Sequence, residues 1–174
     1  VAGVEVHDRA HATRVGPGLV ETADGRRFEA GAVVCCPGDD TRSLFPEMFA
    51  RSPVKRCKLQ MLRTVAQPAG WRLGPHVAGG LTLRHYASFE GCPSLGAVRE
   101  RVARESPEYD RHGIHVMASQ NGLGEVVIGD SHEYADEFGP GLDAEIERLI
   151  LEYLGGMIGL ARPGIAERWY GTYL

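Results

Sequence analysis

A chain of 174 residues is long enough for one domain, or for one domain and part of a second. Hydrophobic residues make up 43% of it and charged residues 24%, which is enough apolar material for a buried core and excludes a disordered chain. The formal net charge of -4, with no block of lysine and arginine, argues against a nucleic-acid-binding surface.

The four cysteines, Cys35, Cys36, Cys57 and Cys92, form no C-x-x-C pair. Reduced thiols in a cytoplasmic protein are therefore the expected state, without a cysteine zinc site. No signal peptide and no apolar stretch of membrane-spanning length is visible. Because the chain begins at Val1 within a strand-like pattern and without an initiator methionine, we expect it to be a fragment.

The N-terminal third is predicted to contain a β-meander. A strand begins near Val4 and Val6, and Gly16-Pro17-Gly18 makes a turn before a strand at residues 19–22. Asp24-Gly25 predicts a type I′ hairpin turn, which needs positive φ at both central residues.

An apolar run follows at residues 32–36 and stops at Pro37-Gly38. Such a run is typical of a fully buried strand in a parallel sheet. A glycine at the carboxyl end of a strand lets the backbone approach a ligand closely, as dinucleotide-binding crevices require. A plain structural strand is the alternative interpretation.

The remaining residues predict antiparallel strands and two helices. Strand composition occurs at residues 58–65, 80–86, 113–119 and 125–129. One helix is expected to begin after Ser94 and end near Ser106-Pro107, and a second to begin near Asp143. The fold class is therefore α+β: residues 46–174 form an antiparallel sheet with two helices, and residues 1–45 form a partial β-meander and a buried strand.

The order of these segments resembles the D-amino-acid-oxidase-like family of FAD-dependent oxidoreductases, which includes glycine and sarcosine oxidases. The resemblance implies that Cys36, Pro37 and Gly38 lie against the flavin dinucleotide, at the position of the family's small-x-Gly motif. It also implies that Ala10 lies near the adenine, and that residues 1–45 are part of an FAD-binding domain. This chain has Cys36-Pro37-Gly38-Asp39-Asp40 where the family usually has alanine-glycine-alanine-tryptophan.

The resemblance extends into the substrate domain. Pro53-Val54-Lys55-Arg56 is similar to the start of a family strand that faces the flavin ring, and residues 124–132 are similar to a glycine-terminated strand near the substrate. The strings at residues 83–86 and 129–134 most resemble a subgroup of predicted oxidases associated with aminophosphonate breakdown. The family's N-terminal G-x-G-x-x-G and its C-terminal glycine-rich segment are absent, so the remaining flavin-binding segments are expected elsewhere in the full-length protein.

His132 is the candidate catalytic residue, because a histidine after a strand end can accept a proton from a substrate amine. A surface-loop histidine is the alternative. The candidate substrate-binding residues carry hydrogen-bonding or cationic groups on predicted strands, and Arg84 offers a fork for an anion, with Glu90 as its alternative partner. The full set is Arg56, Arg84, Tyr86, His115 and Gln120.

Asp130, His132 and Glu133 lack a second ligand group at a supporting spacing, and no metal site is predicted. Trp71 and Trp169 are expected to be packing residues.

The predicted function is oxidation of the C–N bond of a small amine or amino acid, with aminophosphonates as one candidate class, by hydride transfer to FAD. The alternatives are a small-anion-binding module and a structural domain of a larger oxidase. The electron acceptor and the oligomeric state stay open.

Overall fold

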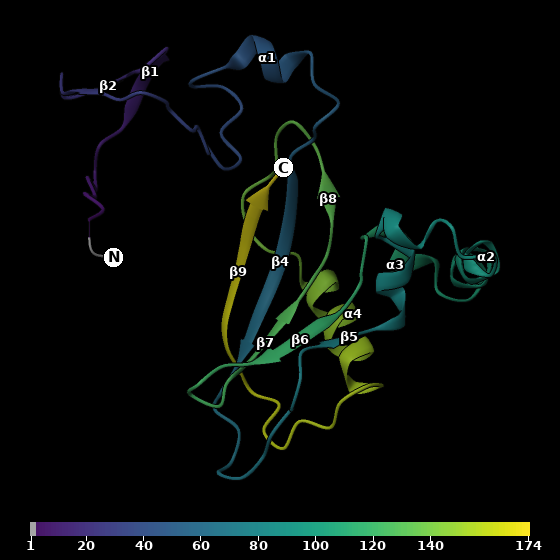
Figure 1. The fold of residues 1–174 in the computed structure, drawn as a ribbon. Helices are drawn as coiled ribbons and strands as arrows, with labels where there is room; N and C mark the ends of the chain where they lie inside the picture. Colours follow the sequence, from purple (N-terminus) through teal and green to yellow (C-terminus); the bar gives the residue numbers. More distant parts are fainter. Residues whose placement is uncertain (1–2) are drawn as a thin grey trace. The chain divides into compact units, whose positions relative to one another are not determined.

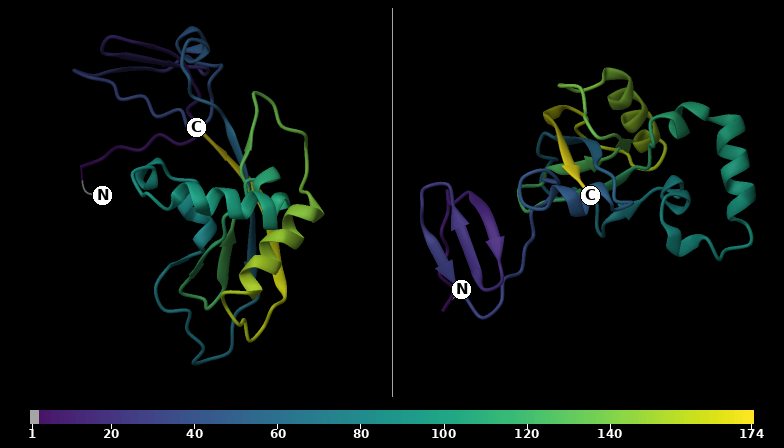
Figure 2. Two further views of the ribbon diagram at one scale, coloured as in Figure 1. Left: turned by 90° about the vertical axis from the view of Figure 1, so that its right-hand side faces the viewer. Right: turned by 90° about the horizontal axis from the view of Figure 1, so that it is seen from above.

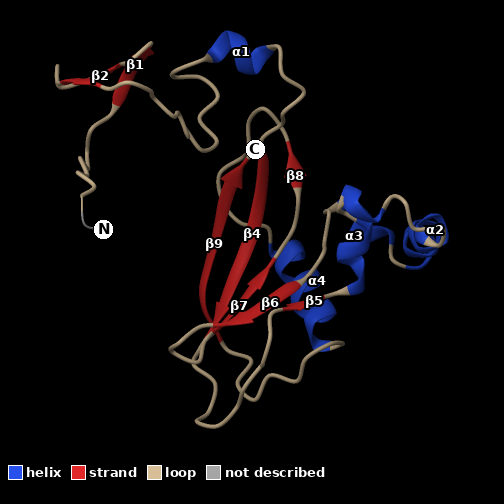
Figure 3. Cartoon of the chain, viewed as in Figure 1, coloured by secondary structure: helices blue, strands red, loops and turns tan. Residues whose placement is uncertain are grey.

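A computed structural model describes residues 3–174 of the chain (Figure 1). It divides into two compact units, one ending at Val54 and one comprising Lys55–Tyr173. The boundary predicted from the sequence lies between residues 45 and 46. The class is mixed α+β with antiparallel sheets, as predicted (Figure 3).

The N-terminal unit contains a three-stranded antiparallel meander and one short helix. The strands β1 (Ala12–Gly16), β2 (Leu19–Thr22) and β3 (Arg27–Glu29) lie in the order β1-β2-β3, and α1 spans Pro46–Ala50.

The hairpin predicted at Asp24-Gly25 is present, although its turn differs from the predicted type. Gly25 has a φ of +83° and donates to the carbonyl of Thr22 at 2.9 Å, while the Thr22 amide donates to the Arg26 carbonyl at 3.0 Å. Asp24 does not have positive φ. A type I turn closed by a glycine bulge fits this pattern, because it needs positive φ only at the glycine.

The prediction of a buried strand at residues 32–36 is wrong. These residues have no ladder partner and are half-buried or exposed, and the side chain of Val34 is 88% exposed. A parallel strand is buried only when neighbouring strands flank it and other elements cover its faces, and residues 3–174 provide neither for this segment. The strand expected near Val4 and Val6 is also absent, and both side chains are exposed.

The second unit is built on a six-stranded antiparallel sheet whose central strand is β4 (Cys57–Thr64). Strand β9 (Ile165–Tyr173) pairs with β4 from end to end, and β7 and β8 pair with successive parts of β4. The remaining strands complete the order β5-β6-β7-β4-β8. Their bounds are β5 (Val77–Ala78), β6 (Met117–Gln120), β7 (Val126–Gly129) and β8 (Glu133–Tyr134). Strand β9 was not predicted, although its aromatic and β-branched residues are typical of strands.

Helix α4 (Ala144–Gly155) covers one face of this sheet (Figures 1 and 2). It begins as predicted at Asp143, whose carboxylate accepts from the Glu145 amide at 2.8 Å. The buried side chains at this interface come from alternate strand positions and from one face of the helix. They include Leu62, Ala118, Val126, Ile128, Ile146, Leu149, Ile150 and Leu154.

The opposite face of the sheet carries no helix of this unit (Figure 2). Residues opposite one another in the register share a face, as do alternate residues of one strand. This rule groups five half-buried apolar side chains on what we call the open face, namely Leu59, Met61, Met117, Val127 and Trp169. Gly129 and Gly171 lie among them. The rule also places there the ion pair of Arg63 with Glu167, which lie 2.8 Å apart. Trp71 packs against the core, whereas Trp169 belongs to the open face.

The other predicted helix is α2 (Leu95–Glu105), which buries Leu95 and Val102 and is followed by the short helix α3 (Pro107–Arg111). The strand predicted at residues 80–86 is wrong. Gly80–Arg84 forms a 3-10 helix, η1, and Ala87–Phe89 forms a second, η2. The adjacent residues Leu81 and Thr82 are both buried, which a half-buried strand with alternating sides would not allow. Within residues 3–174 no helix is both long and apolar enough to cross a membrane.

Candidate active site

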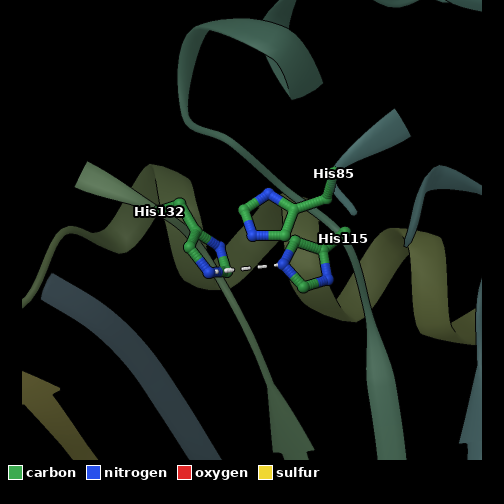
Figure 4. A group of neighbouring side chains, drawn as sticks. All are labelled: His85, His115 and His132. Atoms are coloured by element: carbon green, nitrogen blue, oxygen red, sulfur yellow. Dashed lines mark hydrogen bonds between the residues drawn. The ribbon is translucent and has the colours of Figure 1, made fainter. Parts of the chain in front are cut away.

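Three histidines from distant parts of the sequence, which we call the histidine cluster, meet in the second unit. The rings of His85, His115 and His132 pack against one another with centroids 4.1–4.4 Å apart; His115 stacks on each of the other two, which are tilted to one another by 46° (Figure 4). His115 is 2% exposed and His132 is 8% exposed, while His85 is half-buried. The Nε2 atoms of His115 and His132 lie 3.4 Å apart.

Backbone pairing beyond the ends of β6 and β7 positions two members of the cluster. His115 and Asp130 exchange two backbone hydrogen bonds of 3.2 and 3.3 Å, and the His132 amide donates to the His112 carbonyl at 3.1 Å. Gly113 has a φ of +57°, and a Cβ there would lie 2.7 Å from the His132 carbonyl oxygen. Only glycine allows the two segments to come so close with this backbone conformation.

His85 is held by the anchoring of η1. The Gly79 amide donates to the Val116 carbonyl at 2.8 Å, and the Leu81 amide donates to the hydroxyl of Tyr153, a residue of α4, at 3.3 Å. His85 follows η1 directly and donates its own amide to the Thr82 carbonyl. The 3-10 turn therefore carries its ring to the other two histidines.

The rings of the cluster are not oriented as in a preformed metal site. One nitrogen from each ring lies within 4.8 Å of the others, so these three residues could approach a divalent ion. Zinc–nitrogen bonds of about 2.0–2.1 Å place tetrahedral ligands roughly 3.3 Å apart. Nitrogen lone pairs lie in the ring plane, and the rings of His85 and His132 are inclined to His115 by only 27° and 24°. Binding a metal would therefore require the rings to turn.

Burial keeps the cluster in its neutral form at neutral pH. Burial lowers the pKa of His115 to about 3, aided by the nearby rings of His132 and His85 and by Arg84. Burial likewise lowers the pKa of His132 to about 4, with a further contribution from His85. The pKa of His85 is lowered by burial and by Arg84. Neutral imidazoles can accept a proton, as a general base must.

Two residues beside the cluster were not predicted as site residues. The hydroxyl of Tyr173, at the end of β9, lies 3.0 Å from Nε2 of His132. The Asp130 carboxylate, 6% exposed, has Oδ1 3.6 Å from Nε2 of His115, and burial raises the pKa of Asp130 to about 7. Sequence spacing could not reveal Tyr173, because its strand was not predicted. Asp130 was considered only as a metal ligand.

Of the predicted substrate-binding residues, Tyr86 and Arg84 lie near the cluster. The Tyr86 ring is edge-on to His85 at 5.2 Å, and its side chain is 43% exposed. Arg84 forms an ion pair with Asp110 and donates to the Ile114 carbonyl at 3.4 Å. Its compensating carboxylate is therefore Asp110, whereas Glu90 pairs with Arg99 at 3.8 Å. The role predicted for Arg84 as a fork that binds an anionic substrate therefore receives less support, because the arginine already has an acidic partner.

A cavity of about 500 Å³ adjoins this group. Its lining includes Leu81, Arg84, His85, Asp110, Ile114 and His115. It gives the less buried side of the cluster contact with a space of small-molecule size.

The structure does not bring Gln120 or Arg56 to the histidine cluster. Gln120 ends β6, the strand that follows His115, and its amide accepts from Leu73 and donates to the Gly124 carbonyl. Arg56 precedes β4, donates to the Asp136 carbonyl at 3.3 Å, and lies over the ring of Phe138.

The predicted cofactor residues all lie in the N-terminal unit. Ala10 precedes β1 and is half-buried. Cys36 is exposed, and Gly38 has a φ of +64° with no heavy atom within 4 Å of the position a Cβ would take. The backbone at Gly38 is thus uncovered, and no buried strand precedes it.

Comparison of the chain with family models, curated proteins and solved structures finds no match to any of them.

Proposed function

We propose that this chain supplies the substrate-binding sheet, and part of the flavin-binding domain, of an FAD-dependent oxidoreductase that oxidises the C–N bond of a small amine or amino acid. The observation that carries the proposal is the buried cluster of neutral histidines. The cluster lies where β6 begins and β7 and β9 end, and Tyr173 links it to the open face.

The open face has the properties that a flavin ring needs. Its apolar side chains, which include Met61, Met117 and Trp169, offer an apolar surface to a planar aromatic system. At Gly171 no heavy atom lies within 4 Å of the position a Cβ would take, so a ring can approach the backbone there, whereas the Met61 side chain lies over Gly129. Independently, the open backbone at Gly38 in the N-terminal unit suits contact with the dinucleotide.

The cluster supplies the acid–base chemistry that amine oxidation requires. An alkylamine is mostly protonated at neutral pH, and an ammonium group must lose a proton before its α-carbon can release a hydride. FAD, when bound, accepts that hydride. His132 is neutral and touches Tyr173 of the open face, and so it is the residue suited to take the proton.

The test is to express the whole reading frame that encodes this chain. The purified protein should show the absorbance of oxidised flavin, and anaerobic addition of sarcosine, glycine or 2-aminoethylphosphonate should bleach it. His132→Gln should slow the bleaching about 100-fold or more without removing the flavin, because a general base contributes at least that factor. His76→Gln, at an exposed position, is the matched control and should bleach like the wild type.

A full-length protein without flavin would contradict the proposal. Flavin that no amine of the panel can bleach would contradict it equally.

A further inference from the structure

Four groups that can carry a proton lie in a row through the histidine cluster. Tyr173 Oη is 3.0 Å from Nε2 of His132, which is 3.4 Å from Nε2 of His115. That atom is in turn 3.6 Å from Oδ1 of Asp130. The last separation exceeds a hydrogen bond by about 0.5 Å, and the rings of His132 and His115 are inclined by only 24°, so proton transfer along the row, like metal binding, requires these side chains to turn.

Asp130 ends this row in an environment without a compensating charge. Cys57 of β4, Tyr134 of β8 and Tyr173 of β9 face it electrostatically, and burial raises the pKa of each of these three groups. They are therefore neutral at neutral pH, like His115. Oδ1 has no hydrogen-bond partner among residues 3–174. A buried carboxylate without a cation or a donor binds a proton strongly.

On the basis of the proposed function, we propose that Asp130 is the final acceptor of the proton that leaves the substrate ammonium group, and that His132 and His115 pass it on. The substrate N–H bond breaks and leaves its electron pair on nitrogen, while its proton joins the Tyr173 hydroxyl oxygen as the Tyr173 O–H proton passes to Nε2 of His132. It then moves to Nε2 of His115 and from there to a carboxylate oxygen of Asp130. Both imidazoles return to neutral, and the net change is one ammonium and one carboxylate becoming one amine and one carboxylic acid.

The order of basicity supports Asp130 as the destination. Its pKa of about 7 stands above those of His132, about 4, and His115, about 3. A difference of about 3 units favours the proton on the carboxylate roughly 1,000-fold over His132. Each histidine is then positively charged only between receiving the proton and passing it on.

The test is the pH profile of flavin reduction by sarcosine in the full-length enzyme, for wild type and Asp130→Asn. In the wild type the rate should fall below about pH 7. In Asp130→Asn the fall should move towards pH 4, and the rate at pH 9 should drop about 100-fold, because the strongest base is gone. His115→Gln breaks the row while keeping Asp130 and should move the profile in the same direction. Glu152→Gln, at an exposed position of α4 outside the row, should keep the wild-type profile.

An active Asp130→Asn enzyme with an unchanged profile overturns the relay and leaves the proposed function intact. A wild type that no amine reduces is instead a failure of the proposed function. If Asp130→Asn does not fold, a ¹³C NMR titration of Asp130 in the 174-residue chain decides the question. A carboxyl that titrates near pH 7 supports the relay, and one that titrates near pH 4 overturns it.

Discussion

Replacing Asp130 with asparagine is expected to stabilise the protein progressively as the pH rises from 5 to 9. The side chain is 6% exposed, and burial raises its pKa from 3.8 to about 7. Asparagine has nearly the same shape and no charge to desolvate. The free energy of unfolding of the variant should therefore exceed that of the wild type by an amount that grows with pH.

The size of the effect follows from proton linkage. Because the folded protein binds this proton more tightly than the unfolded chain, the stabilisation is full below about pH 3.8 and is lost as the pH rises through about 7. A shift of about 3 units at about 1.4 kcal/mol per unit amounts to about 4 kcal/mol, of which about 3 kcal/mol falls between pH 5 and pH 9. The lowered pKa values of His115 and His132 reduce the free energy of unfolding as the pH falls, but both histidines are present in wild type and variant, so this effect is shared by the two proteins.

Urea unfolding at five pH values, followed by circular dichroism, measures this difference. Glu125→Gln is the matched control, since hydrogen bonds from Asn121 and Arg63 lower the pKa of Glu125. Its carboxylate is ionised in both states over this range, and so its effect on stability should be nearly constant. A difference between Asp130→Asn and wild type that does not change with pH would refute a buried, proton-binding Asp130.

Three further experiments test how the site is held. Gly113→Ala should lower the free energy of unfolding by about 1–3 kcal/mol, because the φ of Gly113 is +57° and a Cβ there would meet the His132 backbone. Thermal melts should show no such loss for the control Gly96→Ala in α2, where a Cβ meets no other atom. Gln60→Leu should lower the free energy of unfolding by about 2 kcal/mol, since the buried Gln60 amide donates to the Asp143 carbonyl and accepts from the Asp143 backbone amide, each at 2.8 Å. An unchanged midpoint of urea unfolding would contradict this. Arg84→Ala and Asp110→Ala should each destabilise by about 1–3 kcal/mol, with the double variant little worse than either one; additive losses would show that the ion pair contributes nothing.

Local sequence patterns correctly predicted those elements whose conformation depends on residues close in the sequence. The apolar spacing of Ile146, Leu149 and Ile150 fixed helix α4, and Asp24-Gly25 fixed the position of a hairpin. The antiparallel strands at residues 57–64 and 126–129 could also be predicted from their strand composition. Their faces could not, because β4 buries Lys58, Gln60 and Thr64 and leaves the apolar Leu59 and Met61 half-buried.

Local signals failed where distant partners decide the outcome. Residues 32–36 have the composition of a buried strand, but burial requires neighbours that residues 3–174 do not provide. Residues 80–86 have strand composition, yet hydrogen bonds to Val116 and Tyr153 hold them as a 3-10 turn.

By itself, the sequence determined the α+β class and named His115 and His132 as candidates. Only the tertiary structure joined them to His85, Asp130 and Tyr173, because these residues lie on separate segments that meet through the pairing of β6 with β7 and of β4 with β9. The same burial, which no local pattern encodes, removes water from the imidazoles and the carboxylate and thereby reverses their usual order of basicity.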